Sequence, residues 1–151
     1  MKEGIIVAET IHTKQTSICN CMNIRRSSLA ITKIYNEFLA PSGLLVSQYS
    51  PLKQIERLGP VSVSTLALEI RLDRTTLVRN LKALEERAYI IDVAPQGARN
   101  RQLKLTDAGR TILKTAEPLW HEAQDYLADY LGEEDKKTLM ALLAKIEALV
   151  P

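Results

Sequence analysis

Apolar residues recur along most of this chain with the spacing of helices that bury one face. Over residues 17–40 they return every three or four positions, which predicts a long amphipathic helix. Pro41-Ser42-Gly43 then supplies the residue types that end a helix. A second helix is predicted over 47–58, and it begins either at Ser47 or at Ser50, which precedes a proline.

The next pattern predicts two helices joined by a tight turn. A short helix is expected over 65–71, with Ser64 as its N-terminal cap. Asp73 precedes a second helix that extends to about Arg87, and its carboxylate is expected to accept hydrogen bonds from the first free amides of that helix. Two helices in this arrangement form a helix-turn-helix. The face of the second helix that is expected to be buried carries Leu77, Leu81 and Leu84.

Two short apolar runs follow and predict a β-hairpin. The turn between them is Pro95-Gln96-Gly97, which has the residue types of a tight turn. A mainly helical fold with one small β-wing is therefore expected. The two strands are carried by Ile90, Ile91 and Val93 and by Leu103 and Leu105.

The C-terminal part of the chain predicts two more helices. Thr106-Asp107 is expected to cap a long helix that ends at Gly132. A last amphipathic helix is predicted over 133–150, because its apolar residues again recur at helical spacing.

The early, exposed positions of the second helix in the helix-turn-helix carry cationic, hydroxyl and amide side chains. From a helix in the major groove, Arg reads guanine, Asn reads adenine and Thr binds a base or a phosphate. The free amides at the start of this helix favour a phosphate. Arg99 and Arg101 lie at the wing tip or on its return strand, where an Arg reaches the adjacent minor groove. The positions on the helix are Arg74, Thr75, Thr76, Arg79 and Asn80.

Charge is distributed unevenly, although the net charge of the 151-residue chain is only +2. Residues 71–104 contain eight basic and four acidic residues, whereas 117–149 contain eight acidic and three basic residues. A basic segment in a nearly neutral chain favours a surface that faces a polyanion. Ordinary solvated helix surfaces are the alternative explanation. No apolar run reaches the roughly 18 residues of a membrane span, and the N-terminus does not resemble a secretory signal, so a cytoplasmic protein without a membrane partner is expected.

The sequence resembles the MarR family of bacterial transcriptional regulators over nearly its whole length. The resemblance is carried, in order, by "LALEIRLDRTTLVRNLKALEERAYI", "RQLKLTDAGR" and "LGEEDKKTLMALLAKIEAL". It implies a single domain over 1–151, with dimerisation helices at about 15–45 and 107–151 and a winged helix-turn-helix lobe at about 46–106. It further implies a homodimer that binds a pseudo-palindromic operator in double-stranded DNA, usually as a repressor. Many relatives are released by small aromatic acids or phenols, and others by thiol oxidation.

Two positions depart from the family pattern. The wing tip of the family usually reads Asp-x-Arg, and the corresponding triplet here is Gly97-Ala98-Arg99. Arg99 keeps the wing arginine, but the acid that would orient it is absent, and Arg101 is a candidate to share its role. The second helix of the helix-turn-helix, here called the recognition helix, is followed by Ala88, where relatives often have glycine. The loss of an easy left-handed C-cap is expected only to shift the helix boundary.

Cys19 and Cys21 lie close to the expected dimer interface. Neighbours two positions apart on a helix face different directions, so a disulfide between the two is geometrically poor. Three interpretations stay open: small buried apolar residues, redox-sensing thiols activated by nearby arginines and a helix N-terminus, or metal ligands. No metal site is predicted, because the chain has only two histidines.

No phosphate-binding loop, metal-ligand cluster or catalytic triad spacing is present, so neither an enzyme nor a cofactor is expected. The function predicted is that of a dimeric, sequence-specific DNA-binding regulator. The alternatives are a thiol-based redox repressor that uses Cys19 and Cys21, and a dimeric interaction module that does not bind DNA. By position in the family, a small aromatic effector is expected at Tyr35, Phe38, Tyr49, Arg57 and Trp120, for which packing in the core is the competing explanation.

Overall fold

The computed structural model describes residues 13–151 and confirms a mainly helical fold with a two-stranded wing. The predicted domain begins at residue 1, and its first twelve residues lie outside the described part. In chain order the elements are α1 (Asn20–Leu39), the short 3-10 helix η1 (Ala40–Ser42), α2 (Val46–Leu58), α3 (Val63–Ile70), α4 (Arg74–Glu86), β1 (Ile90–Asp92), β2 (Leu103–Leu105), α5 (Asp107–Leu131) and α6 (Glu133–Glu147).

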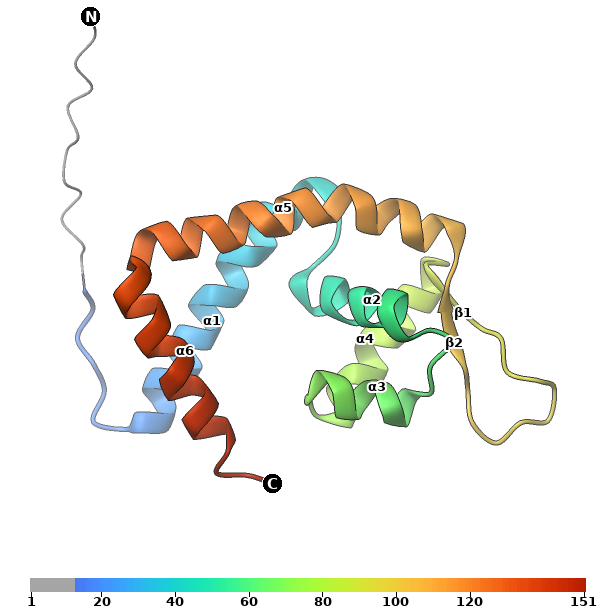
Figure 1. Ribbon diagram of the computed structural model, residues 1–151, viewed down its shortest axis with the longest axis horizontal. Coiled ribbons are helices and arrows are strands. Elements are labelled where there is room, and N and C mark those ends of the chain that lie inside the picture. Colours follow the sequence, from blue (N-terminus) through green and yellow to red (C-terminus); the bar gives the residue numbers. More distant parts are fainter. Residues whose placement is uncertain (1–12) are drawn as a thin grey trace, which may run out of the picture.

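Helix α5 connects two separate parts of the molecule (Figure 1). On one side of its span lie α1 and α6, here called the helical arm. On the other side α2, α3, α4 and the two strands form the winged lobe (Figure 1). Among residues 13–151, no helix is both long enough and apolar enough to cross a membrane.

The hydrophobic core lies in the winged lobe and against α5. Leu77, Leu81 and Leu84 of α4 are buried, as the helical spacing predicted. The core also takes Leu52 and Ile55 from α2. Burying leucine-sized side chains contributes about 1.5–3 kcal/mol each, so this face of α4 fixes how the helix is rotated within the lobe.

The two strands of the wing pair in antiparallel fashion, with Ile90 opposite Leu105 and Asp92 opposite Leu103. Val93 was predicted on the first strand but lies just beyond β1, although its N–H still donates to Gln102 across the hairpin at 2.8 Å. Val61 adds a single bridge to the other edge of β2, and it exchanges two backbone hydrogen bonds with Leu103 at 2.8 and 3.0 Å. The segment before α3 is thereby attached to the base of the wing.

The start of α5 packs tightly against the start of β1. Thr106 caps α5 as predicted, because its hydroxyl oxygen accepts from the N–H of Gly109 at 3.0 Å. A Cβ atom built at Gly109 would lie 2.1 Å from the carbonyl oxygen of Tyr89. Only glycine allows this approach of the two backbones, which explains why glycine occupies this position in "TDAGR".

Several helix boundaries differ from the predictions. Helix α1 begins at Asn20 and not at residue 17. Helix α2 begins at Val46, because the N–H of Val46 donates to the Asn36 side chain at 2.8 Å, a cap from α1 that local sequence does not reveal. Helix α3 is capped by Ser62, whose hydroxyl oxygen accepts from the N–H of Thr65 at 3.1 Å, and not by Ser64. The last helix ends at Glu147 rather than at residue 150.

Helix α4 ends with a left-handed residue although that residue is alanine. Ala88 has a φ angle of 56°. Its N–H donates to Glu85 at 2.9 Å, and the N–H of Tyr89 donates to Leu84 at 3.0 Å, which together make a Schellman motif. The prediction that alanine would lose this C-cap and shift the boundary is therefore wrong. The buried face of α4 before Ala88 and the tight junction after it impose the left-handed conformation.

We predict that Ala88→Gly stabilises the protein by about 1 kcal/mol, because glycine adopts a positive φ angle without the clash of a Cβ atom. Ala83→Gly in the interior of the same helix is the matched control and should destabilise it by about 1 kcal/mol. The free energy of unfolding in urea, measured at one fixed protein concentration, checks both values. A loss of stability in Ala88→Gly would contradict the left-handed assignment.

Candidate nucleic-acid interface

Helix α4 presents its predicted contact residues on the side opposite the core. Arg74, Thr75, Thr76 and Arg79 are exposed, and Asn80 is half-buried. Leu77, Leu81 and Leu84 of the same helix face the core, and this sets the rotation of α4 so that the contact residues face outward. The sequence therefore predicted this exposed face correctly, except that Asn80 is partly covered by its neighbours.

The first turn of α4 is held by Asp73. Its two carboxylate oxygens accept from the N–H groups of Thr75 at 2.9 Å and Thr76 at 3.0 Å, and the Thr76 hydroxyl also donates to the carboxylate. That hydroxyl bond, followed by the two backbone bonds, holds the pKa of Asp73 below its usual value. Two of the amides that were expected to favour a phosphate, those of Thr75 and Thr76, are therefore already bound by Asp73.

A hollow of 290 Å³ lies between the start of α3, the exposed face of α4 and the wing. It brings Arg74 of α4 and Arg99 of the wing to one concave surface, although they are far apart in sequence. Arg74 and Arg99 form no ion pair with any residue in 13–151. Arg79 also forms none and does not line the hollow, but its charge helps to lower the pKa of Asp73. The hollow is lined by Ser62, Val63, Ser64, Arg74, Val78, Arg99, Asn100 and Arg101.

Arg101 differs from Arg74, Arg79 and Arg99 because two carboxylates contact it. Its guanidinium pairs with Glu85 of α4, and its Nε atom lies 3.3 Å from Oδ2 of Asp92 on β1. The other oxygen of Asp92 accepts from the N–H groups of Gln102 at 3.0 Å and Ala94 at 2.9 Å. These backbone bonds hold the pKa of Asp92 below its usual value. Sequence reasoning missed Glu85 and Asp92, because nothing local to either residue indicates the pairing.

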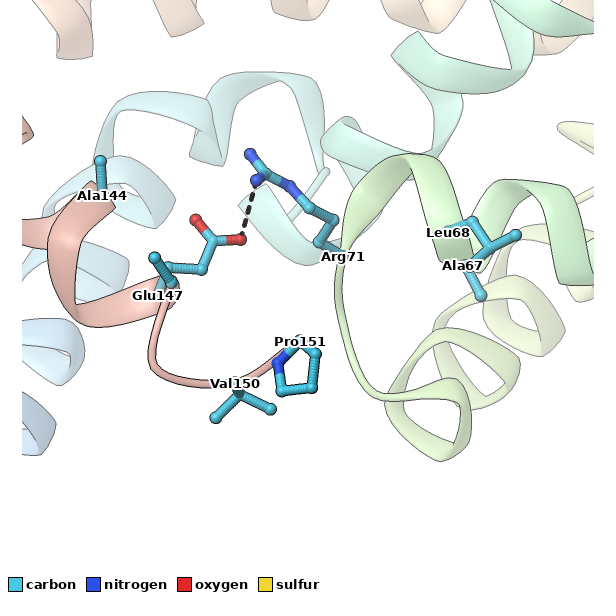
Figure 2. A pocket seen from close by; sticks show the side chains of 8 residues that line it. Ala67, Leu68, Arg71, Ala144, Glu147, Val150 and Pro151 are labelled. Atoms are coloured by element: carbon cyan, nitrogen blue, oxygen red, sulfur yellow. Dashed lines mark ion pairs between the residues drawn. The ribbon is translucent and has the colours of Figure 1, made fainter.

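A second groove separates the winged lobe from the helical arm. Figure 2 shows Arg71, at the end of α3, reaching toward Glu147 on α6, and their Nη1 and Oε1 atoms lie 3.2 Å apart. The groove has a volume of 680 Å³. Exposed pairs of this kind contribute about 0–1 kcal/mol, so the ion pair joins the two parts only weakly. The lining residues are Ala67, Leu68, Arg71, Ala144, Glu147, Ala148, Val150 and Pro151.

The five residues predicted for an effector take part in side-chain contacts within the chain. Tyr49 is buried and stacks on Trp120, with ring centroids 5.7 Å apart. Phe38 packs against Tyr126 at 5.4 Å. None of the five lines either hollow described above.

The two remaining effector candidates are also engaged elsewhere. The Tyr35 hydroxyl donates to the Gln124 side chain. Arg57 pairs with Glu69 at 2.7 Å. Because Tyr49 of α2 stacks on Trp120 of α5, these two candidates belong to the packing between the two helices.

Both cysteines are exposed free thiols in the single chain. Cys19 is the N-cap residue of α1, and Cys21 lies in its first turn. The interpretation that they are small buried residues therefore does not hold within one chain. Among residues 13–151, no group of three or more His, Cys, Asp or Glu side chains is arranged to hold a metal ion.

Comparison with known proteins identifies relatives over most of the chain. No family model matches. An uncharacterised helix-turn-helix transcriptional regulator of Bacillus cereus is 30% identical over 115 residues, which cover 76% of this chain and 77% of the relative.

Solved structures show the same fold. The regulator MosR of Mycobacterium tuberculosis in complex with DNA is 31% identical, with a TM-score of 0.74 over 88% of this chain and 99% of MosR. The repressor CouR, bound to p-coumaroyl-CoA, is 26% identical with a TM-score of 0.75 over 85% of this chain and 91% of CouR. A mutant of MarR from Escherichia coli, in complex with operator DNA, shares only the fold, at 22% identity and a TM-score of 0.72 over 85% of this chain and 91% of MarR.

These relatives are transcriptional regulators and not enzymes, which agrees with the function predicted from the sequence. The match to MosR spans 88% of the chain, so it is not confined to the winged lobe. The chain belongs to the MarR family of winged helix-turn-helix transcriptional regulators, which bind DNA.

Proposed function

We propose that this DNA-binding regulator is a homodimeric repressor that reads a pseudo-palindromic operator with α4 and the wing. One observation carries the proposal: Arg74 of α4 and Arg99 of the wing line one hollow and form no ion pair with residues 13–151. Arginines that share a concave surface without a carboxylate partner attract a phosphate backbone. The DNA in the MosR complex supports the same assignment by similarity.

The proposed DNA contacts fall into two groups, those made by α4 and the one made by the wing. Arg79 lies one turn into α4 on its exposed side, where a side chain reaches base edges in the major groove. Arg74, Thr75 and Asn80 flank it and are assigned to bases or phosphates. Thr76 contributes mainly through its cap with Asp73. Arg99 on the wing is assigned to the adjacent minor groove.

The dimer is proposed because the helical arm has no covering in a single chain. Helix α6 buries none of its residues, although it is amphipathic. Contiguous exposed apolar surface of this kind marks an interface, and a second copy supplies a matching surface across a two-fold axis. The exposed apolar side chains of α1, α5 and α6 include Met22, Ile24, Leu29, Ile31, Tyr126, Tyr130, Met140, Leu142, Leu143 and Ile146.

Release by a small aromatic ligand is the first mechanism that we propose for regulation. CouR supports it, because that repressor binds p-coumaroyl-CoA. The groove beside Arg71 has a volume within the range of about 300–1,000 Å³ that is typical of ligand sites, and it lies between the lobe and the arm. A ligand there acts on the relative position of the two parts.

Thiol oxidation is the second candidate, favoured by the exposure of both Cys19 and Cys21. Hydrogen peroxide oxidises two thiols to a disulfide and is itself reduced to two water molecules. A disulfide between two subunits, or between one cysteine and a small thiol, would displace α1. Since the arm connects the two lobes of the dimer, the spacing of the two α4 helices would then change.

We predict that Arg79→Ala changes which bases are tolerated in duplexes selected from random DNA, because a major-groove contact carries sequence information. Arg99→Ala should instead weaken binding most at A·T-rich flanks, where the minor groove is narrow. Lys114→Ala, which removes a positive charge from α5, is the control and should leave the selected sequence unchanged. If Arg79→Ala and Arg99→Ala lower affinity equally for all sequences, the assignment of base reading to Arg79 is wrong.

We predict that peroxide releases the wild-type protein from its selected duplex and that a thiol reductant restores binding. The double variant Cys19→Ser, Cys21→Ser should stay bound, because it has no thiol to oxidise. The same titration with aromatic acids tests the first mechanism in both proteins. An equal response of parent and double variant to peroxide, or no response in either, would rule out thiol control.

A further inference from the structure

We infer that Arg101 is a positioning residue for the wing and not a DNA contact. Together with Glu85 and Asp92 it forms a clamp that ties the base of the wing to the recognition helix and thereby places Arg99. The inference rests on the proposed function, in which Arg99 enters the minor groove. It replaces the sequence-based expectation that Arg101 shares the role of Arg99.

The clamp joins three elements. Arg101 follows the wing loop and reaches back to Glu85 in the last turns of α4, where its Nη1 atom lies 3.3 Å from Oε2 and Nη2 contacts the other carboxylate oxygen. This two-point pairing of a guanidinium with a carboxylate fixes direction as well as distance. The Nε atom of Arg101 points to Asp92 at 3.3 Å. One guanidinium therefore links α4 to the strand that begins the wing.

Asp92 extends the clamp into the loop on both sides. One of its oxygens accepts from the N–H of Ala94, on the outgoing limb, and from the N–H of Gln102, on the returning limb. The two limbs are thus held together below the tip. At the tip itself, the N–H of Ala98 donates to Pro95 at 3.0 Å. No acidic residue lies between Asp92 and Leu103, so the carboxylates that contact Arg101 lie at the base of the wing and not at its tip.

The charges separate Arg101 from Arg99. Arg101 faces two carboxylates, so its positive charge is locally compensated. Each of its three nitrogen atoms, Nε, Nη1 and Nη2, already contacts a carboxylate oxygen. Arg99 pairs with no acid within the described part of the chain and remains available to DNA. Two arginines that are two positions apart therefore have different roles.

Glu85→Gln provides the sharpest test. It removes a negative charge beside the DNA, so simple electrostatics predicts tighter binding, whereas the clamp predicts binding about fivefold weaker, as expected for the loss of roughly 1 kcal/mol. Glu86→Gln is the matched control, because Glu86 is the next residue on α4 and forms no ion pair with residues 13–151. It should bind DNA as tightly as the wild type or more tightly.

A double-mutant cycle separates positioning from contact. If Arg101 acts only through Arg99, then Arg101→Ala should weaken binding in the wild type but have no further effect in the Arg99→Ala variant. Additive losses in the double variant would mean that Arg101 contacts DNA by itself, and the inference would be wrong.

Amide hydrogen exchange tests the clamp without DNA. Exchange at Val93, Ala94 and Gln102 should become about fivefold faster in Glu85→Gln and stay unchanged in Glu86→Gln. Unchanged exchange in Glu85→Gln would overturn the clamp. Faster exchange in a protein that binds no selected duplex would leave the clamp standing and reject the proposed operator function instead.

Discussion

The burial of one face of α4 is the constraint on which the interface depends. Leu77, Leu81 and Leu84 are each at most 2% exposed, and removing any one of them from the core would cost about 2–5 kcal/mol. No surface contact of α4 approaches that magnitude, so the leucines alone decide how the helix is rotated. Because that rotation is fixed, Arg74 and Arg79 point away from the core. The face that α4 offers to DNA is therefore a consequence of core packing.

The position of the wing also depends on the packing of α4, because the wing follows this helix directly in the chain. A left-handed Ala88 turns the chain immediately after α4, and the close approach of Gly109 to Tyr89 fixes the next step. Val61 then pairs with Leu103 and attaches the wing to the segment before α3. The hollow that contains Arg74 and Arg99 is therefore the outcome of backbone contacts between elements that are distant in sequence. The ion pairs of Arg101 add to these backbone contacts at the base of the wing.

The sequence predicted the features that depend on local pattern. Helical spacing identified the buried leucines of α4, and the caps at Asp73 and Thr106 followed from residue type and position. The features it missed depend on partners elsewhere in the chain. Asn36 caps α2 from another helix, and Arg101 finds Glu85 through the return of the wing. Position in a family pattern also does not reveal that Tyr49 stacks on Trp120 in the packing of α2 against α5.

The central claim is that two copies of α4, held apart by the helical arms, enter successive major grooves. The most direct test measures stoichiometry and affinity on duplexes in which the distance between the selected half-sites is varied. We expect two chains per duplex and strongest binding when the half-sites are about 10 base pairs apart, because one helical turn returns the groove to the same face. Moving them by about 5 base pairs, half a turn, should abolish tight binding. One chain per duplex, with an affinity independent of the spacing, would contradict this account.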